Sequence, residues 1–206
     1  MAAVGKARIG NTPEPEASGV ARGKRFERSN LMKSLSKQEL LMLLAAAKAH
    51  RERDWLMTLV CFWHGLRASE LVSFQRDAIA DGYLTVRRPD GSHRVRHMLI
   101  EHPEPLLDEK NALIEFAERT EPGVPVFNVC RRRVDQLMKY YCSEVGIAAE
   151  LAHAHTLRHT VARLSIESAG IEHTRRWLGH KSMGSIYQYL KVAEETPAQA
   201  AMAAKV

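Results

Sequence analysis

The residues best suited to chemistry lie between His155 and Tyr189. Arg158 ends in a planar fork of N–H donors whose shape matches two phosphate oxygens. Histidines such as His155 and His180 can gain or lose a proton near neutral pH. A tyrosine hydroxyl, with an ordinary pKa of about 10, becomes a useful nucleophile only beside groups that stabilise developing negative charge. Together, these side chains predict a site that attacks a phosphodiester.

A second arginine, Arg67, lies far upstream, where it interrupts an apolar run at the expected start of a helix. Four short motifs follow one another along the chain: Leu66-Arg67-Ala68-Ser69-Glu70, His155-Thr156-Leu157-Arg158-His159, Leu178-Gly179-His180, and a tyrosine nine residues after that last histidine. With these motifs in this order, the chain resembles the tyrosine recombinases, also called phage integrases, and especially the short fimbrial-switch type of DNA invertase. The resemblance covers roughly residues 35 to 192.

The resemblance implies a set of catalytic residues, which are Arg67, His155, Arg158, His180 and Tyr189. The two arginines would clamp the non-bridging oxygens of one scissile phosphate. His155 would assist proton transfer, and His180 would hydrogen-bond a phosphate oxygen. Tyr189 would attack the phosphorus and form a 3′-phosphotyrosyl link.

Neighbouring residues of the same types are assigned other roles. Tyr187 is set aside because the family spacing of nine residues from the Leu-Gly-His histidine leads to Tyr189. His159 is expected to brace the fold, and His153 to be incidental. Glu70 is expected to hold or cap near the arginine of its motif, because a carboxylate facing a phosphate would repel it. No metal site is expected, since the histidines have no acidic or cysteine partner at a familiar ligand interval.

The elements that must position these residues are predicted to be mainly α-helical, with a small antiparallel β-hairpin, in the tyrosine recombinase catalytic-domain fold. A capping box at Ser36-Lys37-Gln38-Glu39 starts the first helix. Further helices are expected over Arg53–His64, Leu106–Glu118, Cys130–Val145, Thr156–Ala169 and Ile171–Trp177, and strands over Tyr83–Val86 and Val95–Ile100. We expect a disordered basic arm (1–33), the catalytic domain (34–192) and a tail (193–206) that is the candidate for docking on a neighbouring protomer. The arm is too short for the helical DNA-clamping domain of longer relatives.

Basic side chains are the predicted DNA contacts. They are Arg87, Arg88, Arg94 and Arg96 on the hairpin, Arg131, Arg132 and Arg133 at a helix start, and Lys181. A helix start disfavours positive charge, and nearby phosphates would relieve that cost. The hairpin of the family carries a lysine that protonates the leaving 5′ oxygen, whereas no lysine lies between Lys48 and Lys110 here. An arginine does not readily release a proton, because its pKa is above 12.

Composition fits this interpretation. The chain has 206 residues, enough for one sizeable domain, and a formal net charge of +6 that favours acidic macromolecules as partners. Its three cysteines have no CxxC spacing, which indicates a reducing compartment. No apolar run approaches the roughly 20 residues that span a bilayer. We therefore expect a cytoplasmic protein without a membrane segment.

The resemblance also implies partners. The substrate would be double-stranded DNA, and four protomers on two DNA sites would carry out two strand exchanges as a homotetramer. DNA-bending accessory proteins are further candidate partners. No ATP, metal or other cofactor is required, because the phosphotyrosyl ester keeps the energy of the broken bond. Integration, inversion and resolution are all left open.

Three other interpretations stay open. A non-catalytic DNA-binding regulator would keep the fold, and the absent hairpin lysine favours it. A type IB topoisomerase would share the Arg, His and Tyr chemistry but would religate the same strand. A helical interaction module unrelated to DNA would show the same generic composition.

Overall fold

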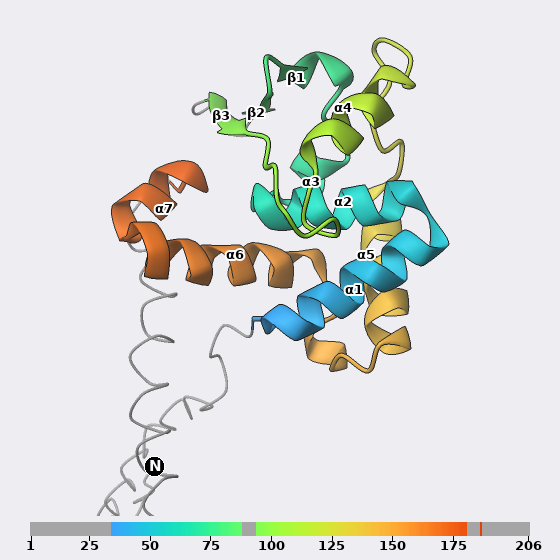
Figure 1. Ribbon diagram of the computed structural model, residues 1–206, viewed down its shortest axis with the longest axis vertical. Coiled ribbons are helices and arrows are strands. Elements are labelled where there is room, and N and C mark those ends of the chain that lie inside the picture. The colour runs from blue at the N-terminus through green and yellow to red at the C-terminus, as the bar shows by residue number, and fades with distance from the viewer. Residues whose placement is uncertain (1–33, 88–93, 181–185, 187–206) are drawn as a thin grey trace, which may run out of the picture.

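The computed structural model of the chain describes residues 34–87, 94–180 and residue 186 (Figure 1). The described helices are α1 (Lys37–His50), α2 (Glu52–Trp63), α3 (Ala68–Leu71), α4 (Lys110–Glu118), α5 (Arg131–Glu144), α6 (Ala154–Ala169) and α7 (Ile171–Trp177), with 3₁₀ turns at Arg76–Ala78 and Ala149–Leu151. The strands are β1 (Ile79–Ala80), β2 (Tyr83–Arg87) and β3 (Arg94–Met98). The predicted fold class, mainly α with a small antiparallel sheet, is confirmed. The expected arm and tail lie outside the described residues. Among the helices described, none combines the length and the apolar character that crossing a membrane requires.

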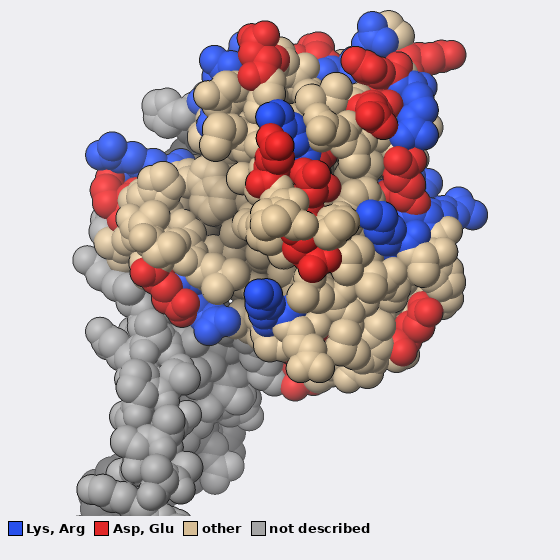
Figure 2. Space-filling model, viewed as in Figure 1, with Lys and Arg blue, Asp and Glu red and all other residues tan. Residues whose placement is uncertain are grey.

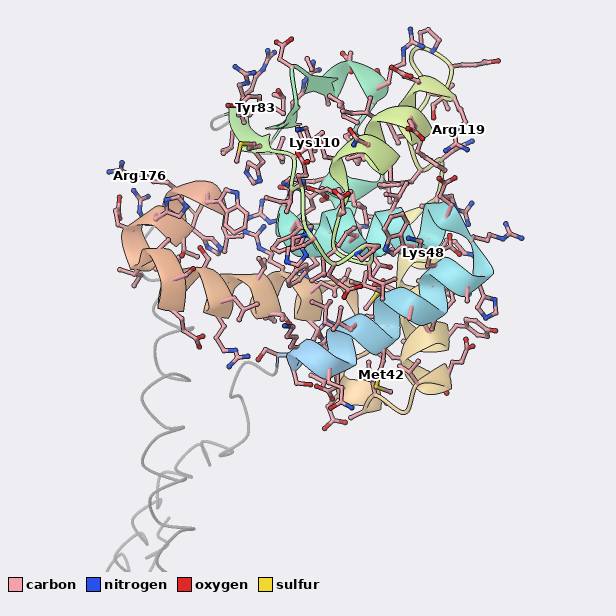
Figure 3. All side chains as sticks on the ribbon, in the orientation of Figure 1. Met42, Lys48, Tyr83, Lys110, Arg119 and Arg176 are labelled. Atoms are coloured by element: carbon pink, nitrogen blue, oxygen red, sulfur yellow. The ribbon has the colours of Figure 1, made fainter. Side chains whose placement is uncertain are left out.

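Helix α1 begins at the predicted capping box. Ser36 Oγ accepts a hydrogen bond from the backbone N–H of Glu39 (3.2 Å), and the Glu39 carboxylate accepts one from the N–H of Ser36 (2.7 Å). These contacts satisfy N–H groups that have no partner inside a helix. The buried leucines of α1 pack on α2, and at this contact Lys48 Nζ lies 3.9 Å from the centre of the Trp55 ring (Figure 3).

Helix α2 forms the centre of the core, because every residue from Asp54 to Phe62 is buried. A helix that is apolar on nearly all sides must be covered on all sides. Helices α1, α3, α4 and α6 all contact it. The buried carboxylate of Asp54 accepts hydrogen bonds from the Tyr141 hydroxyl of α5 and from the Arg53 guanidinium, each at 2.8 Å. These bonds fix the first turn of α2 against α5.

The three strands form one antiparallel sheet in the order β1-β2-β3. Tyr83 pairs with Met98 and Arg87 pairs with Arg94, so the predicted hairpin is confirmed. Its tip at Pro89-Asp90-Gly91 lies outside the described residues. Leu84, Val86 and His97 are buried on one side of the sheet. Because strand side chains alternate between faces, Arg87, Arg94 and Arg96 lie on the other side.

Helix α4 starts later than predicted. The sequence suggested Leu106–Glu118, but the helix begins at Lys110. The indole N–H of Trp55 donates to the Leu106 carbonyl (3.0 Å), and that of Trp63 donates to the Leu107 carbonyl (2.8 Å). These carbonyls therefore face α2, and the preceding residues form a turn that ties α4 to the core.

Candidate active site

The turn that carries Arg67 follows the end of α2. Gly65 has a φ of 55°, a conformation that favours glycine, and the Leu66 N–H bonds back to the Cys61 carbonyl (3.2 Å). The backbone N–H of Arg67 donates to the Glu70 carboxylate (2.8 Å), and the Arg67 guanidinium lies 3.3 Å from the same side chain. Glu70 therefore caps α3 and holds Arg67, as predicted. The Arg67 side chain stays 37% exposed.

Arg158 joins three separate segments of the chain. It lies in the second turn of α6 and is only 3% exposed. Its guanidinium donates hydrogen bonds to the carbonyls of Gly65 and of Leu178, the latter at 2.9 Å. It also lies 3.0 Å from Nε2 of His180. The Arg67 turn, α6 and the end of α7 thus meet at one guanidinium.

His180 is held in place by the end of α7. Its backbone N–H donates to the Arg175 carbonyl (2.9 Å), and the Arg175 guanidinium donates to the His180 carbonyl (3.1 Å). Glu172 holds Arg175 in turn, at 2.8 and 2.9 Å. A guanidinium has no acceptor atom, so Nε2 of His180 accepts from Arg158 and the ring proton sits on Nδ1. This ring can therefore donate a hydrogen bond from Nδ1, the role expected of it toward a phosphate oxygen.

His155 is exposed in the first turn of α6. Partial burial lowers its pKa below the ordinary value, and the positive charges of Arg158 and Arg67 lower it further. The imidazole is therefore neutral at neutral pH and can accept a proton. The rings of His155 and His159 stack with centres 6.1 Å apart, and burial lowers the pKa of His159 to about 4.

His153 has a role that the sequence prediction missed. It is the N-cap of α6, and its Nδ1 accepts a hydrogen bond from the backbone N–H of Thr156 (3.2 Å). The prediction that it is incidental is wrong. Its place three residues before Thr156 at a helix start was the available signal, but histidine is not among the usual capping residues.

Several predicted site residues lie outside the described part of the chain: Arg88, Lys181, Tyr189 and the alternative Tyr187. Ile186, the residue before the two tyrosines, is described and fully buried. It packs with Ala162 of α6 and with Leu178, whose carbonyl accepts from Arg158. The chain therefore returns to the Arg158 region just before the tyrosines.

The predicted DNA contacts that are described are all exposed: Arg87, Arg94, Arg96, Arg131, Arg132 and Arg133. Arg96 lies over the Tyr83 ring, 4.4 Å from its centre. Helix α5, which begins with Arg131, Arg132 and Arg133, contacts α6. On the face seen in Figure 2, basic and acidic side chains are interspersed.

Curated relatives of the chain are tyrosine recombinases by name. It is 29% identical over 177 residues to tyrosine recombinase XerA of Thermococcus kodakarensis, covering 81% of this chain and 60% of that protein. It is 31% identical over 175 residues to XerA of Pyrococcus furiosus, covering 79% and 58%. The chain thus spans about 60% of the length of these relatives. The narrower resemblance to fimbrial-switch invertases stays a prediction.

Solved structures share the fold. The crystal structure of XerA recombinase aligns with a TM-score of 0.67 at 17% identity, covering 86% of this chain and 66% of that one. XerH bound to its difH substrate before cleavage gives 0.63 at 17% identity, covering 77% and 50%. A lambda integrase tetramer bound to a Holliday junction gives 0.54 at 21% identity, covering 76% and 47%. At these identities the likeness establishes the fold alone.

A family profile also matches the sequence directly. The profile described as the phage integrase family covers residues 33–196, which is most of the chain and includes every segment that meets at Arg158. The chain therefore belongs to the phage integrase family.

Proposed function

We propose that this chain is the catalytic domain of a site-specific DNA recombinase that cuts and rejoins DNA through a 3′-phosphotyrosyl intermediate. One observation carries the proposal: two arginines and two histidines from distant segments converge. Arg158 binds the turn before Arg67 and contacts His180, and both arginines lower the pKa of His155. Two guanidinium groups beside a neutral histidine suit a phosphate that gains negative charge during attack.

In the proposed reaction, Arg67 and Arg158 bind the non-bridging oxygens of the scissile phosphate. The Tyr189 hydroxyl attacks the phosphorus as His155 accepts its proton, and the bond to the 5′ oxygen breaks. That oxygen takes up a proton and leaves as a 5′ hydroxyl. A 5′ hydroxyl from a partner strand then attacks the phosphotyrosyl ester and restores the DNA backbone. The number of ester bonds is unchanged, so no ATP is consumed.

Tyr189 is proposed as the nucleophile on its spacing from His180. The position of Ile186 is consistent with this choice, because Ile186 packs against Leu178, whose carbonyl accepts from Arg158. From Ile186 to Tyr189 is three residues, about 10 Å of fully extended chain at most. A tyrosine side chain adds to that reach.

Double-stranded DNA is the proposed partner, with four protomers in the synapse. The exposed arginines of the hairpin and of the first turn of α5 support this, because guanidinium groups bind phosphates well. The similar XerH and lambda integrase structures hold DNA, the latter as a tetramer. We also propose the domain limits given above, with the catalytic domain over residues 34–192.

One observation favours a second function, that of a DNA-binding regulator with weak or no cleavage. The described parts of the hairpin carry Arg87, Arg94 and Arg96, and no lysine occurs between residues 48 and 110. An arginine can donate a hydrogen bond to the leaving oxygen, but its high pKa makes it a poor general acid.

The test is covalent capture from a pool of nicked duplexes of random sequence. The nick lets a short fragment diffuse away after cleavage, so the phosphotyrosyl complex accumulates and survives detergent. We expect capture by wild type and by Tyr187→Phe, and none by Tyr189→Phe. Capture by Tyr189→Phe together with loss in Tyr187→Phe would reverse the assignment. A DNA gel shift without any capture would favour the regulator.

A second experiment tests whether the absence of a hairpin lysine weakens the general acid. In a captured sequence, the leaving 5′ oxygen is replaced by sulfur, which needs little protonation to leave. If the general acid is weak, the sulfur substrate is cleaved faster than the oxygen substrate. Equal rates would show that another group supplies the proton well. Relaxation of a supercoiled plasmid without a specific site would instead point to topoisomerase chemistry.

A further inference from the structure

A second group of titratable side chains lies in the core behind the Arg67 turn. It consists of His64, His97 and Glu109, which are 1%, 2% and 0% exposed. Nε2 of His64 lies 2.8 Å from Oε1 of Glu109, and Nδ1 of His64 lies 3.3 Å from Nδ1 of His97. Oε1 of Glu109 also accepts a hydrogen bond from the backbone N–H of Ile100 (3.1 Å). We call these three residues the buried relay.

Two members of the buried relay, His64 and His97, each lie next to a part of the candidate site. His64 immediately precedes Gly65, whose carbonyl accepts from Arg158. His97 lies on β3, and its ring centre is 5.4 Å from that of Trp177. Trp177 immediately precedes Leu178, whose carbonyl is the second acceptor of Arg158. In Figure 1 the end of α2, the sheet and α7 surround the same region.

The contact between the two histidines of the relay is directional. Two Nδ1 atoms that face each other at hydrogen-bond distance require one to carry the proton and the other to accept it. The opposite nitrogen of His64 lies 2.8 Å from Oε1 of Glu109 but forms no hydrogen bond with it, so the contact with His97 is the hydrogen bond that holds this ring. Apolar side chains of similar volume would fill this space without the cost of desolvating polar groups. What the polar contact between the two histidines adds is a defined distance and angle between the end of α2 and β3.

Resting on the proposed function, we propose that His97, acting through His64, is a positioning residue for strand cleavage. It fixes the Gly65 and Leu178 carbonyls relative to each other and relative to the hairpin, and thereby sets the orientation of the Arg158 guanidinium. The relay is buried, so we expect it to contact neither the DNA nor the reacting atoms. Its effect is therefore expected in the rate of cleavage at saturating protein and not in DNA affinity.

The test compares two variants of His97 in the full chain. His97→Phe keeps a ring against Trp177 and removes both nitrogens. His97→Asn removes the ring but places an amide atom where Nδ1 stood, so it can keep the bond to His64. On a captured nicked duplex at saturating protein, we expect His97→Phe to lower the single-turnover rate constant at least about tenfold, because small misplacements of catalytic groups are costly. We expect His97→Asn to stay within about threefold of wild type, and DNA affinity to be unchanged in both.

The single-turnover rate constant and the fraction of protein that reacts are measured separately, and this distinguishes a positioning role from structural support. If His97 only stabilised the fold, His97→Phe would reduce the fraction of protein that reacts and leave the rate constant of that fraction unchanged. That outcome, or a fall of equal size in both variants, would overturn the proposal.

Hydrogen exchange without DNA tests the coupling apart from the recombinase assignment. In His97→Phe, faster amide exchange is expected in residues 64–71 and 171–178 as well as in β3, with His97→Asn close to wild type. Faster exchange confined to β3 would refute the positioning role of His97, even if the wild-type protein cleaves DNA. If exchange is faster in all three segments but the wild-type protein captures no DNA, the coupling through His97 is supported and the proposed recombinase function is refuted.

A measurement on the wild type covers the case in which His97→Phe does not fold. Nitrogen NMR of the imidazoles should show one protonated Nδ1 among His64 and His97, with its proton protected from solvent. Rapid exchange of that proton would refute the hydrogen bond.

Discussion

We expect the two arginines of the site to contribute differently to stability, although both take part in catalysis. Arg158 is 3% exposed and serves three acceptors: the Gly65 carbonyl, the Leu178 carbonyl and the His180 ring. Arg67 is 37% exposed and contacts Glu70 at 3.3 Å. The matched perturbations are Arg158→Lys and Arg67→Lys, which keep the positive charge and remove the planar fork of donors.

The expected cost follows from these contacts. The shorter, compact ammonium of lysine can serve at most part of the acceptor set of Arg158, and each buried acceptor left unsatisfied costs about 1–3 kcal/mol. With two acceptors lost, Arg158→Lys should lower the free energy of unfolding by about 3 kcal/mol. Arg67→Lys keeps a cation near Glu70 in a partly exposed pair, worth about 0–1 kcal/mol. Its free energy of unfolding should therefore fall by less than about 1 kcal/mol.

Catalysis should respond to the two changes alike. Removing one preorganised donor to a developing charge typically costs about a hundredfold in rate. Urea unfolding measures stability, and single-turnover capture on a nicked duplex at saturating protein measures cleavage under conditions where both variants are folded. Equal destabilisation by both substitutions would refute the view that only Arg158 is built into the core. A near-normal cleavage rate in folded Arg67→Lys would remove Arg67 from the site.

Three further predictions concern single residues. Gly65→Ala places a Cβ against Leu178 at a φ of 55°, so we expect a loss of at least about 2 kcal/mol in urea unfolding. Tyr141→Phe removes the buried bond to Asp54, and the melting temperature should fall by an amount equivalent to about 1–2 kcal/mol. The lowered pKa of His159, about 4, means that the unfolded chain binds more protons between pH 6.5 and 4, so stability falls as pH falls through this range. Because the ring is partly exposed, that loss should be about 1–2 kcal/mol, and His159→Gln should flatten the slope in urea unfolding at each pH.

Features determined by short stretches of sequence were predicted well. The capping box fixed the start of α1 because its two hydrogen bonds join residues three apart. The Tyr83 strand and its partner were recognisable because a turn signal lies between them. The order and spacing of four motifs were enough to indicate the family, and Glu70 could be given its capping role because it lies three residues after Arg67.

Other features depended on contacts between distant residues. The start of α4 moved to Lys110 because indoles from α2 bind the carbonyls before it. His153 caps α6 because its ring lies where Nδ1 accepts a hydrogen bond from the backbone N–H of Thr156.

The sequence by itself determined which side chains could act on a phosphate, because that ability depends on residue type and on local spacing. Only the tertiary structure decided that Arg158 takes its orientation from the Gly65 and Leu178 carbonyls, and that His64 meets His97 in the core. Backbone carbonyls are present at every residue and carry no mark in the sequence. Which of them meets a given guanidinium depends on how α2, α6 and α7 pack, a property of the whole fold.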